Sequence, residues 1–382
     1  MHLNIDYIAS ININGNSGKE KATGEKLSAL ESSQHSVDSF VLRKESSTLI
    51  TKLFVIIFLE LNYLFKKIFS KNPPDLIFTR STFGFSEYII GNLFHVPVIR
   101  EIHGDFIDEA NIFFEKNRVL KLFSVLYSKY INFFLKKSNG IIFNNDLLEK
   151  HFTDNYRLNG IQKITISNGC SIDKFYPIDP SIARLKLGLD PDIIYLLFIG
   201  SVNKWHGVEY LIDTQNEISS LSNRFRLLIV GANENSYVNK LKGKSSANRD
   251  IIFKGRVSAD ESLLYINASN ISLIPVNPVR VSPGSPLKLF DTIACGKPVI
   301  TQINTPGYSD ITQKYNIGYT CNFFKPRESA LKIIEISKKI DYEEFRNHNR
   351  LVAEKYLSWN KIIEKWISFG LLVKKGSKSV AY

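Results

Sequence analysis

Runs rich in branched apolar residues alternate along the chain with segments of helical spacing. The strand-like runs are 3–11, 37–43, 74–80, 96–103, 140–145 and 163–168 in the first half, and 193–200, 224–231, 250–255, 270–276 and 297–302 in the second. Strands that are apolar at nearly every position are typical of parallel sheets covered on both faces. The alternation therefore predicts an α/β protein with two Rossmann-like domains.

Length agrees with that architecture, because 382 residues are enough for two domains that each bury a core. Between the two sets of strands lies FYPIDPSIARLKLGLDPD (175–192), which contains three prolines and has no strand pattern. We predict an interdomain linker near 176–192. The predicted domains are residues 1–175 and 176–357.

The stretch SPGSPLKLFDTIACGKPVI (282–300) predicts a short helix over about 286–295 with a phosphate-binding start. Ser285 suits the N-cap and Pro286 the first helical position. The first turn of such a helix leaves backbone N–H groups free for an anion, and Lys288 adds a full positive charge. Asp291, three residues further on, is placed to accept hydrogen bonds from a ribose. The alternative is a capped surface helix with an incidental Lys and Asp.

Other loops follow the C-terminal ends of strands, where ligands bind in open α/β sheets. SVNKWHG (201–207) leads from the strand ending at Gly200 into a helix and offers Lys204 and His206 as anion ligands. The alternative is that Trp205 and His206 only pack the turn.

The first domain contributes two such loops. NGNSGK (14–19) contains Gly15, which would let the backbone approach a ligand, although a plain loop is the alternative. IREIHGDFIDEA (99–110) places His103 at a strand end, where it can donate a hydrogen bond to a sugar hydroxyl or carry a proton. The alternative is a histidine satisfied by the local backbone. The nearby carboxylates lack a recognised spacing for metal ligands.

Composition narrows the partners and the compartment. The net charge of +12 favours acidic partners: nucleotides, anionic lipid surfaces or nucleic acid. The three cysteines have no close spacing and are expected to be reduced thiols in a cytoplasmic protein without a signal peptide. The apolar run LFVIIFLELNYLF (53–65) is too short to span a bilayer, so we expect a buried helix there.

Three motifs in this order resemble family 4 of the GT-B glycosyltransferases, the glycosyl transferases group 1. SNGCSIDKFYP (167–177) resembles the signature before their linker, IGSVNKWHGVEYLI (199–212) their donor-phosphate turn, and SPLKLFDTIACGKPVI (285–300) their donor-site helix. The resemblance covers nearly the whole chain. It implies a GT-B fold with two Rossmann-like domains facing each other across a deep cleft and the C-terminal helix 358–382 packing back on the first domain.

The same resemblance implies transfer of a sugar from a nucleotide donor, UDP- or GDP-linked, with retention of configuration and without a metal or other cofactor. It implies His103, Lys288 and Asp291 as catalytic residues. The donor-binding residues that we predict are Gly15, Gly200, Ser201, Lys204, His206, Arg256, Gly284, Ser285, Pro286 and Leu287.

The chain departs from the common family pattern at four positions, Ser201, His206, Pro283 and Asp291, the last of which is an Asp in place of a Glu. The phosphate turn of the family has an Arg and a Lys where this chain has Ser201 and His206, and Lys204 and Lys288 are expected to supply the charge. Of the family's paired acids, the first position is Pro283 and the second Asp291. Backbone N–H groups at Gly284 and Ser285 are expected to take over contacts to the sugar or phosphate.

The family is widely used in building surface polysaccharides such as lipopolysaccharide and capsule, which favours a glycan or lipid-linked glycan acceptor. The segment 116–137 mixes lysines with Phe and Tyr and is expected either to contact the inner face of an anionic membrane or to be an ordinary domain helix with a basic outer face. The rival functions are a GT-B-like binding partner without activity and a sugar-nucleotide epimerase. Nucleic-acid binding ranks last, because the basic residues are spread along the chain.

Overall fold

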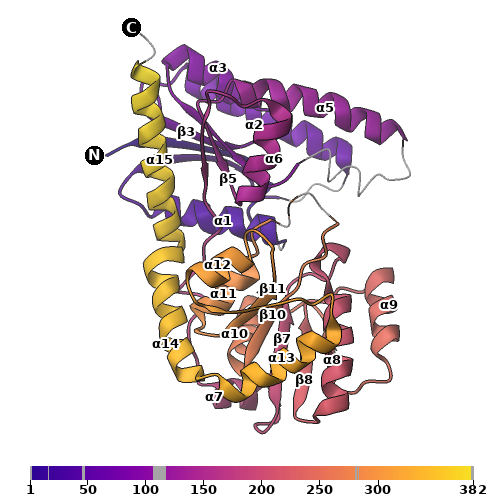
Figure 1. Ribbon diagram of the computed structural model, residues 1–382. Helices are drawn as coiled ribbons and strands as arrows, with labels where there is room; N and C mark the ends of the chain where they lie inside the picture. Colours follow the sequence, from indigo (N-terminus) through magenta and orange to yellow (C-terminus); the bar gives the residue numbers. More distant parts are fainter. Residues whose placement is uncertain are drawn as a thin grey trace. The chain divides into compact units, whose positions relative to one another are not determined.

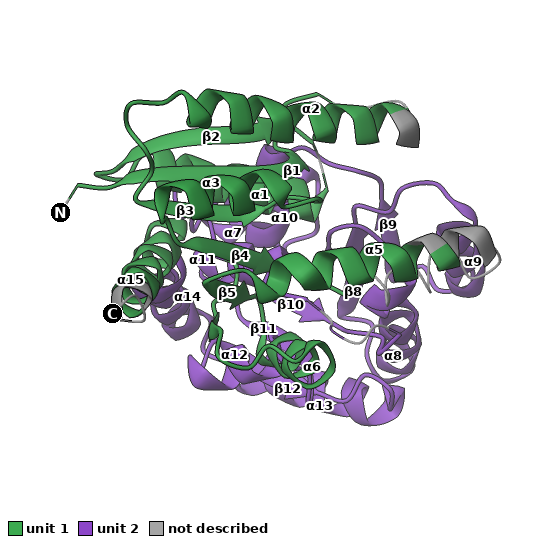
Figure 2. Cartoon of the chain, turned by 90° about the horizontal axis from the view of Figure 1, so that it is seen from above, with its two compact units in different colours: residues 1–168, 359–382 green, residues 169–358 purple. Residues whose placement is uncertain are grey.

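The computed structural model describes residues 2–15, 17–44, 48–105, 118–279, 282 and 284–379. The chain divides into unit 1, residues 1–168 and 359–382, and unit 2, residues 169–358 (Figure 2). The segment predicted as a linker holds helix α7 (Pro180–Leu187), for which Asp179 is the N-cap. This helix packs on α10 (Ala259–Ala268) within unit 2.

Unit 1 contains a parallel sheet of six strands in the order β2-β1-β3-β4-β5-β6 (Figure 1). Its strands are β1 (Asn4–Asn12), β2 (Ser36–Leu42), β3 (Leu76–Arg80), β4 (Val98–Ile102), β5 (Gly140–Phe143) and β6 (Gln162–Thr165). Its helices are α1 (Gly18–Glu31), α2 (Leu49–Ile68), α3 (Phe85–Phe94), α5 (Arg118–Lys136), α6 (Asp146–Tyr156) and α15 (Trp359–Ser379).

Unit 2 contains a second parallel sheet of six strands in the order β12-β11-β10-β7-β8-β9. Its strands are β7 (Ile194–Ile199), β8 (Phe225–Val230), β9 (Ile251–Lys254), β10 (Ile271–Ile274), β11 (Val299–Gln302) and β12 (Gly318–Cys321). Its remaining helices are α8 (Val208–Leu221), α9 (Ser236–Ser245), α11 (Leu287–Ala294), α12 (Ser309–Lys314), α13 (Pro326–Lys339) and α14 (Tyr342–Val352).

The two parallel sheets with flanking helices confirm the predicted fold of two Rossmann-like domains. Every strand predicted from the sequence is present, and the sequence analysis missed only β12. That strand lies at the edge of its sheet, and Cys321 is its single buried residue. An edge strand with little burial lacks the continuous apolar run that identified the others.

The last helix, α15, is part of unit 1 although it follows unit 2 in the sequence. Trp359 Nε1 donates to Glu25 Oε2 of α1 at 3.0 Å, and Lys374 Nζ lies 2.5 Å from Asp75 Oδ1. A side chain at Gly370 would meet Leu76, so the glycine lets α15 lie close against the sheet. These contacts explain why the chain returns to its first sheet at the end.

Helix α2 corrects a prediction. The apolar run 53–65 was expected to be buried, yet Phe54 is 69% exposed and Phe58 71%, while Glu60 is completely buried. The expectation was wrong because a helix that is apolar on most sides gives no pattern to identify its inner face. Among the described residues, no helix is long and apolar enough to cross a membrane.

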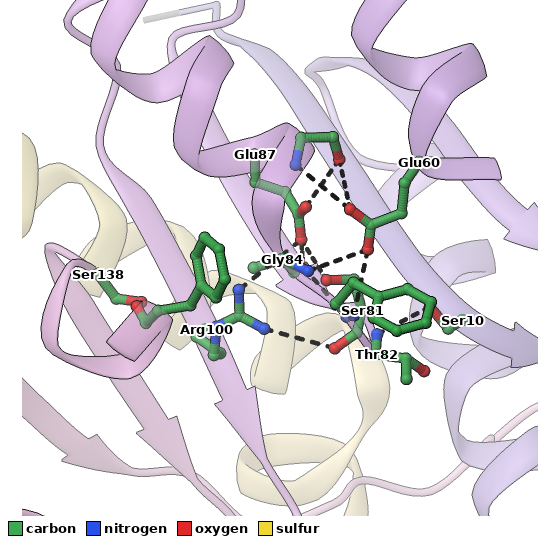
Figure 3. A network of polar contacts seen from close by, with 12 residues as sticks. Ser10, Glu60, Ser81, Thr82, Gly84, Glu87, Arg100 and Ser138 are labelled. Carbon is green, nitrogen blue, oxygen red and sulfur yellow. Dashed lines mark hydrogen bonds and ion pairs between the residues drawn. The ribbon is translucent and has the colours of Figure 1, made fainter. Parts of the chain in front are cut away.

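The buried Glu60 ties α2 to the start of α3 (Figure 3). Its carboxylate accepts from the backbone N–H of Gly84 at 3.0 Å and lies 2.9 Å from the hydroxyl of Ser86. The same hydroxyl lies 2.8 Å from Glu87, whose other oxygen is 3.9 Å from Arg100. Because a hydroxyl has one hydrogen, one of the two carboxyl groups must hold a proton to bond Ser86. Burial and the charge of Glu87 raise the pKa of Glu60 to about 7, so Glu60 is the group that holds it.

This geometry predicts how stability varies with pH. The folded-state pKa of Glu60 lies above its ordinary value of 4.5. The protonated carboxyl therefore contributes fully to the free energy of unfolding below about pH 4.5, and this contribution is lost as the pH rises through 7. Glu60→Gln reproduces the protonated carboxyl, and we expect the variant to be more stable than the wild type at pH 8, by at most about 3 kcal/mol.

Urea unfolding from pH 5 to pH 8 measures the effect, with Glu31→Gln on the exposed surface of α1 as the matched control. The wild type and the control should lose stability over this range more steeply than Glu60→Gln. Parallel pH profiles for all three proteins would show that Glu60 is ionised throughout.

Candidate active site

In unit 2 the ends of β7 and β8 approach each other closely at two glycines. Gly200 has φ +123° and Gly231 has φ +99°, both in the region that favours glycine. A Cβ at position 231 would lie 2.5 Å from the carbonyl oxygen of Gly200. The N–H of Gly231 also donates to the carbonyl of Gly255, which immediately precedes the exposed Arg256. The predicted residues Gly200 and Arg256 therefore follow β7 and β9, the two strands that flank β8 in one sheet.

Lys288, in the first turn of α11, reaches the end of β7. Its Nζ lies 4.0 Å from the centre of the Phe198 ring, and a Cβ at position 200 would lie 3.2 Å from its Cε. Glycine at 200 therefore leaves room for the lysine stem. Burial lowers the pKa of the Lys288 ammonium to about 7. An anion bound beside Nζ would raise this pKa, because it stabilises the charged form.

The start of α11 differs by one residue from the prediction. Pro286, with φ −81° and ψ 116°, is the N-cap, and Leu287 is the first helical residue, so Ser285 does not cap the helix. The extended conformation of Pro286 delays the helical turn. Gly284 precedes it with φ +84°, and its N–H donates to Ser282 Oγ at 3.3 Å. Asp291 follows Lys288 by three residues on the same helix and is partly buried. Pro283 lies outside the described residues.

The loop after β7 forms a 3₁₀ turn at Lys204–His206. Ser201 and Lys204 are exposed, whereas the ring of His206 lies 6.1 Å from that of Phe198 and 5.8 Å from that of Trp205. The carbonyl of Trp205 accepts from the N–H of Asn277 at 3.0 Å. Aromatic packing of His206 agrees with the alternative that this side chain shapes the turn. Lys204 remains available for an anion.

The sequence analysis missed the contact between Asn277 and Glu209, which lies next to this turn. Asn277 Nδ2 donates to Glu209 Oε1 at 3.1 Å, and Tyr237 Oη donates to Glu209 Oε2 at 2.5 Å. Glu209 stands in the first turn of α8, where a carboxylate is favoured by the helix dipole. The pair connects the loop after β10 to the helix that follows the 3₁₀ turn. The acidic residue two positions after Gly207 was the available signal.

In unit 1, His103 follows β4 and is held by a buried carboxylate. Its Nε2 lies 2.8 Å from Glu101 Oε2, and Glu101 also pairs with Lys26 and accepts from Tyr7 Oη at 3.1 Å. Burial alone would raise the pKa of Glu101, but the charge of Lys26 and the histidine bring it to about 2. Glu101 is therefore ionised at neutral pH.

His103 itself is neutral. Burial, together with the charge of Arg80, lowers its pKa to about 3. A neutral ring that bonds an ionised carboxylate carries its hydrogen on Nε2, which leaves Nδ1 as an acceptor. Asn144 Nδ2 lies 3.5 Å from that Nδ1. A sugar hydroxyl at this atom would have to donate, which reverses the donor role predicted for His103.

The surroundings of His103 come from several elements of unit 1. Lys26 Nζ from α1 lies 4.2 Å from the ring of Trp366 in α15. Lys26, His103, Asn144 and Trp366 line a small recess that Asn168 completes. The sequence analysis did not connect Lys26 with Glu101, because 75 residues separate them. A carboxylate within the buried strand VIREI was the only sign that a buried cation must face it.

Gly15 lies in the loop before α1. A Cβ there would lie 2.2 Å from the carboxyl carbon of Glu20, which accepts from the N–H of Ser17 at 2.8 Å as part of a capping box. The N-terminus of α1 is thus capped by its own side chains. The plain-loop alternative is sufficient to explain this glycine. Gly15 and His103 lie in unit 1, and the other predicted site residues lie in unit 2.

Two parallel six-stranded Rossmann-like units define the GT-B class of fold. The chain is similar to sucrose-phosphate synthase from Thermosynechococcus elongatus, with a TM-score of 0.71 and 15% identity over 98% of this chain and 100% of that one. It is also similar to Anabaena HepE, solved in complex with UDP and glucose, with a TM-score of 0.64 and 14% identity over 96% of this chain and 100% of that one. At such identity the likeness shows the fold.

Sequence comparison supports the family that the motifs predicted. Residues 181–352 match the glycosyl transferases group 1. Over 305 residues the chain is 22% identical to an uncharacterized glycosyltransferase of Methanocaldococcus jannaschii, a match that covers 76% of this chain and 74% of the relative. The family match includes the β7 turn and all of α11, where Lys288 and Asp291 stand.

The buried ion pair of unit 1 yields a stability prediction. Lys26→Met leaves the Glu101 carboxylate buried without its cation, and we expect a loss of about 3–5 kcal/mol in the free energy of unfolding. Lys26→Met combined with Glu101→Gln should lose clearly less, because no unpaired charge remains. Chemical denaturation of these two proteins and of Glu101→Gln alone measures the coupling, with Lys21→Met on the exposed side of α1 as the control. Additive losses would mean that the two side chains do not stabilise each other.

Proposed function

We propose that this chain is a retaining glycosyltransferase that moves a sugar from a UDP- or GDP-linked donor to a glycan or lipid-linked glycan without a metal. The main supporting observation is that Lys288, in the first turn of α11, lies close to Gly200 at the end of β7. A cation, free N–H groups of a helix start and a glycine together suit a diphosphate. The HepE neighbour, solved with UDP and glucose, supports a nucleotide-linked donor. The family's use in surface polysaccharides supports the acceptor class.

Each residue then has a chemical role. As the bond to the sugar breaks, the departing oxygen of the diphosphate gains a negative charge, which Lys288 and the N–H groups at the start of α11 stabilise as it develops. Asp291 accepts hydrogen bonds from the ribose and so fixes the position of the reacting carbon. In this scheme the acceptor attacks on the face from which the diphosphate departs, and the departing oxygen takes the acceptor's proton. The neutral His103 accepts a hydrogen bond from a sugar hydroxyl at Nδ1.

Two rival functions use the same fold. A GT-B-like partner without activity would bind the nucleotide sugar and not consume it, and the loss of the family's first acid at Pro283 favours this rival. A sugar-nucleotide epimerase would form a product without an acceptor. Following the donor by proton NMR, with and without a mixed glycan acceptor pool, separates transfer, epimerisation and simple binding.

Asp291 supplies the first binding test. Titration calorimetry with UDP and with GDP in EDTA should show binding of one nucleotide by the wild type. Asp291→Asn should weaken it about tenfold or more, as expected for hydrogen bonds to a charged group. Asp192→Asn, an exposed acid before the N-terminal end of β7, is the control. No binding of either nucleotide by the folded wild type would exclude this donor site for both bases.

Lys288 supplies a second test, which measures proton uptake when the nucleotide binds. Its pKa of about 7 makes it mostly neutral at pH 8 in the free protein, and a bound diphosphate raises this pKa. We therefore expect nucleotide binding at pH 8 to take up nearly one proton. Calorimetry in buffers that differ in ionisation enthalpy counts that proton. Lys288→Arg keeps the charge without the titration and should bind with no uptake; equal uptake by both proteins would assign the proton to another group.

A further inference from the structure

Helices α2, α3 and α5 of unit 1, labelled in Figure 1, carry exposed apolar side chains that the proposed reaction does not use. We call it the three-helix face. Its most exposed side chains include Phe54, Phe58, Phe65 and Phe69 from α2 and its end, and Leu122 and Leu126 from α5. The face belongs to unit 1 alone, so the inference does not depend on the donor site in unit 2.

Helix α2 presents its apolar stripe outward. Phe54, Phe58, Leu61 and Phe65 follow the spacing of one helical face, and all four are exposed. The opposite stripe contains the fully buried Glu60 and the buried Lys67, which lies 2.7 Å from Asp6. The outward aromatic stripe is thus a fixed feature of the helix.

The three helices are joined into one platform. Tyr88 of α3 contacts the rings of Phe133 and Phe134 in α5, with centres 6.2 Å and 5.8 Å apart. Tyr127 of α5 donates to the carbonyl of Thr82, and Glu60 of α2 binds the N–H groups at the start of α3 (Figure 3). Helix α3 packs on α2 and also contacts α5 through the rings around Tyr88. The face is therefore preformed.

The charge on these helices has one sign. Lysines 52, 66, 129 and 136 are exposed along α2 and α5. The acidic residues within α2, α3 and α5 are Glu60 and Glu87, and both are completely buried. Exposed aromatic and aliphatic side chains on helices that also carry exposed lysines and no exposed carboxylate complement a surface of anionic lipid headgroups. A second copy of the chain would set lysines against lysines.

We propose that the three-helix face binds the surface of an anionic phospholipid bilayer, with its phenylalanines entering the headgroup region and its lysines contacting phosphates. The predicted membrane contact of segment 116–137 is one part of this surface, and α2, expected to be buried, is the larger part. The proposal does not depend on which acceptor the protein uses, because it concerns binding to a membrane surface and not the transferred sugar.

Flotation of the full chain with vesicles tests the proposal. Vesicles of phosphatidylcholine with one quarter phosphatidylglycerol should carry the protein upward at low salt, and phosphatidylcholine alone should carry much less. Phe58→Ser with Phe65→Ser should reduce binding to the anionic vesicles about tenfold or more. Leu185→Ser with Leu351→Ser, equally exposed apolar positions in unit 2, should leave it unchanged. Thermal unfolding by circular dichroism verifies that both double variants are folded.

Three outcomes would overturn the proposal. Equal binding of both double variants to anionic vesicles would place the contact elsewhere on the molecule. Concentration-dependent dimerisation in sedimentation velocity, abolished by the phenylalanine variant, would assign the face to a second copy. Binding that persists in 0.5 M salt on neutral vesicles would likewise contradict the role given to the lysines.

Discussion

A parallel sheet has to be covered on both faces, and this requirement organises the whole molecule. Helices occupy the faces of both sheets, so the ends of the strands are where loops can present polar groups. At the C-terminal ends, Gly200 and Gly231 let two neighbouring strand ends approach, and α11 brings Lys288 into the space that glycine leaves. The same requirement places α2, α3 and α5 as an outer layer of unit 1. The candidate donor site and the three-helix face are therefore consequences of one constraint applied to two sheets.

Much of the fold was predictable because buried strands are continuous apolar runs with little ambiguity. The strands from β1 to β11 follow from such runs. The predictions failed where the apolar pattern of the sequence does not match the burial of the side chains. β12 is a partly exposed edge strand, and α2 is apolar on the outside and polar within. Hydropathy alone cannot identify the inner face of such a helix.

The candidate site was predictable to a different degree in each unit. In unit 2 the loops and α11 are local in sequence, so Gly200 and Lys288 could be chosen from motifs, while the cap of α11 was misplaced by one residue. In unit 1 the environment of His103 depends on Lys26 and Glu101, which meet through the fold. Protonation states follow from such long-range contacts. That is why the neutral, accepting ring of His103 could be assigned only from the structure.

Helix α2 shows how polar groups can fix the rotation of a helix about its axis. Burial of apolar area would be nearly the same for several rotational settings of this helix, since branched and aromatic residues occur on most sides. Hydrogen bonds are directional, and Glu60 reaches Gly84 and Ser86 in one setting only. Lys67 lies on the same stripe, about two helical turns after Glu60, and pairs with Asp6 and Asp38. Buried polar contacts, more than the hydrophobic effect, thus choose which phenylalanines face outward.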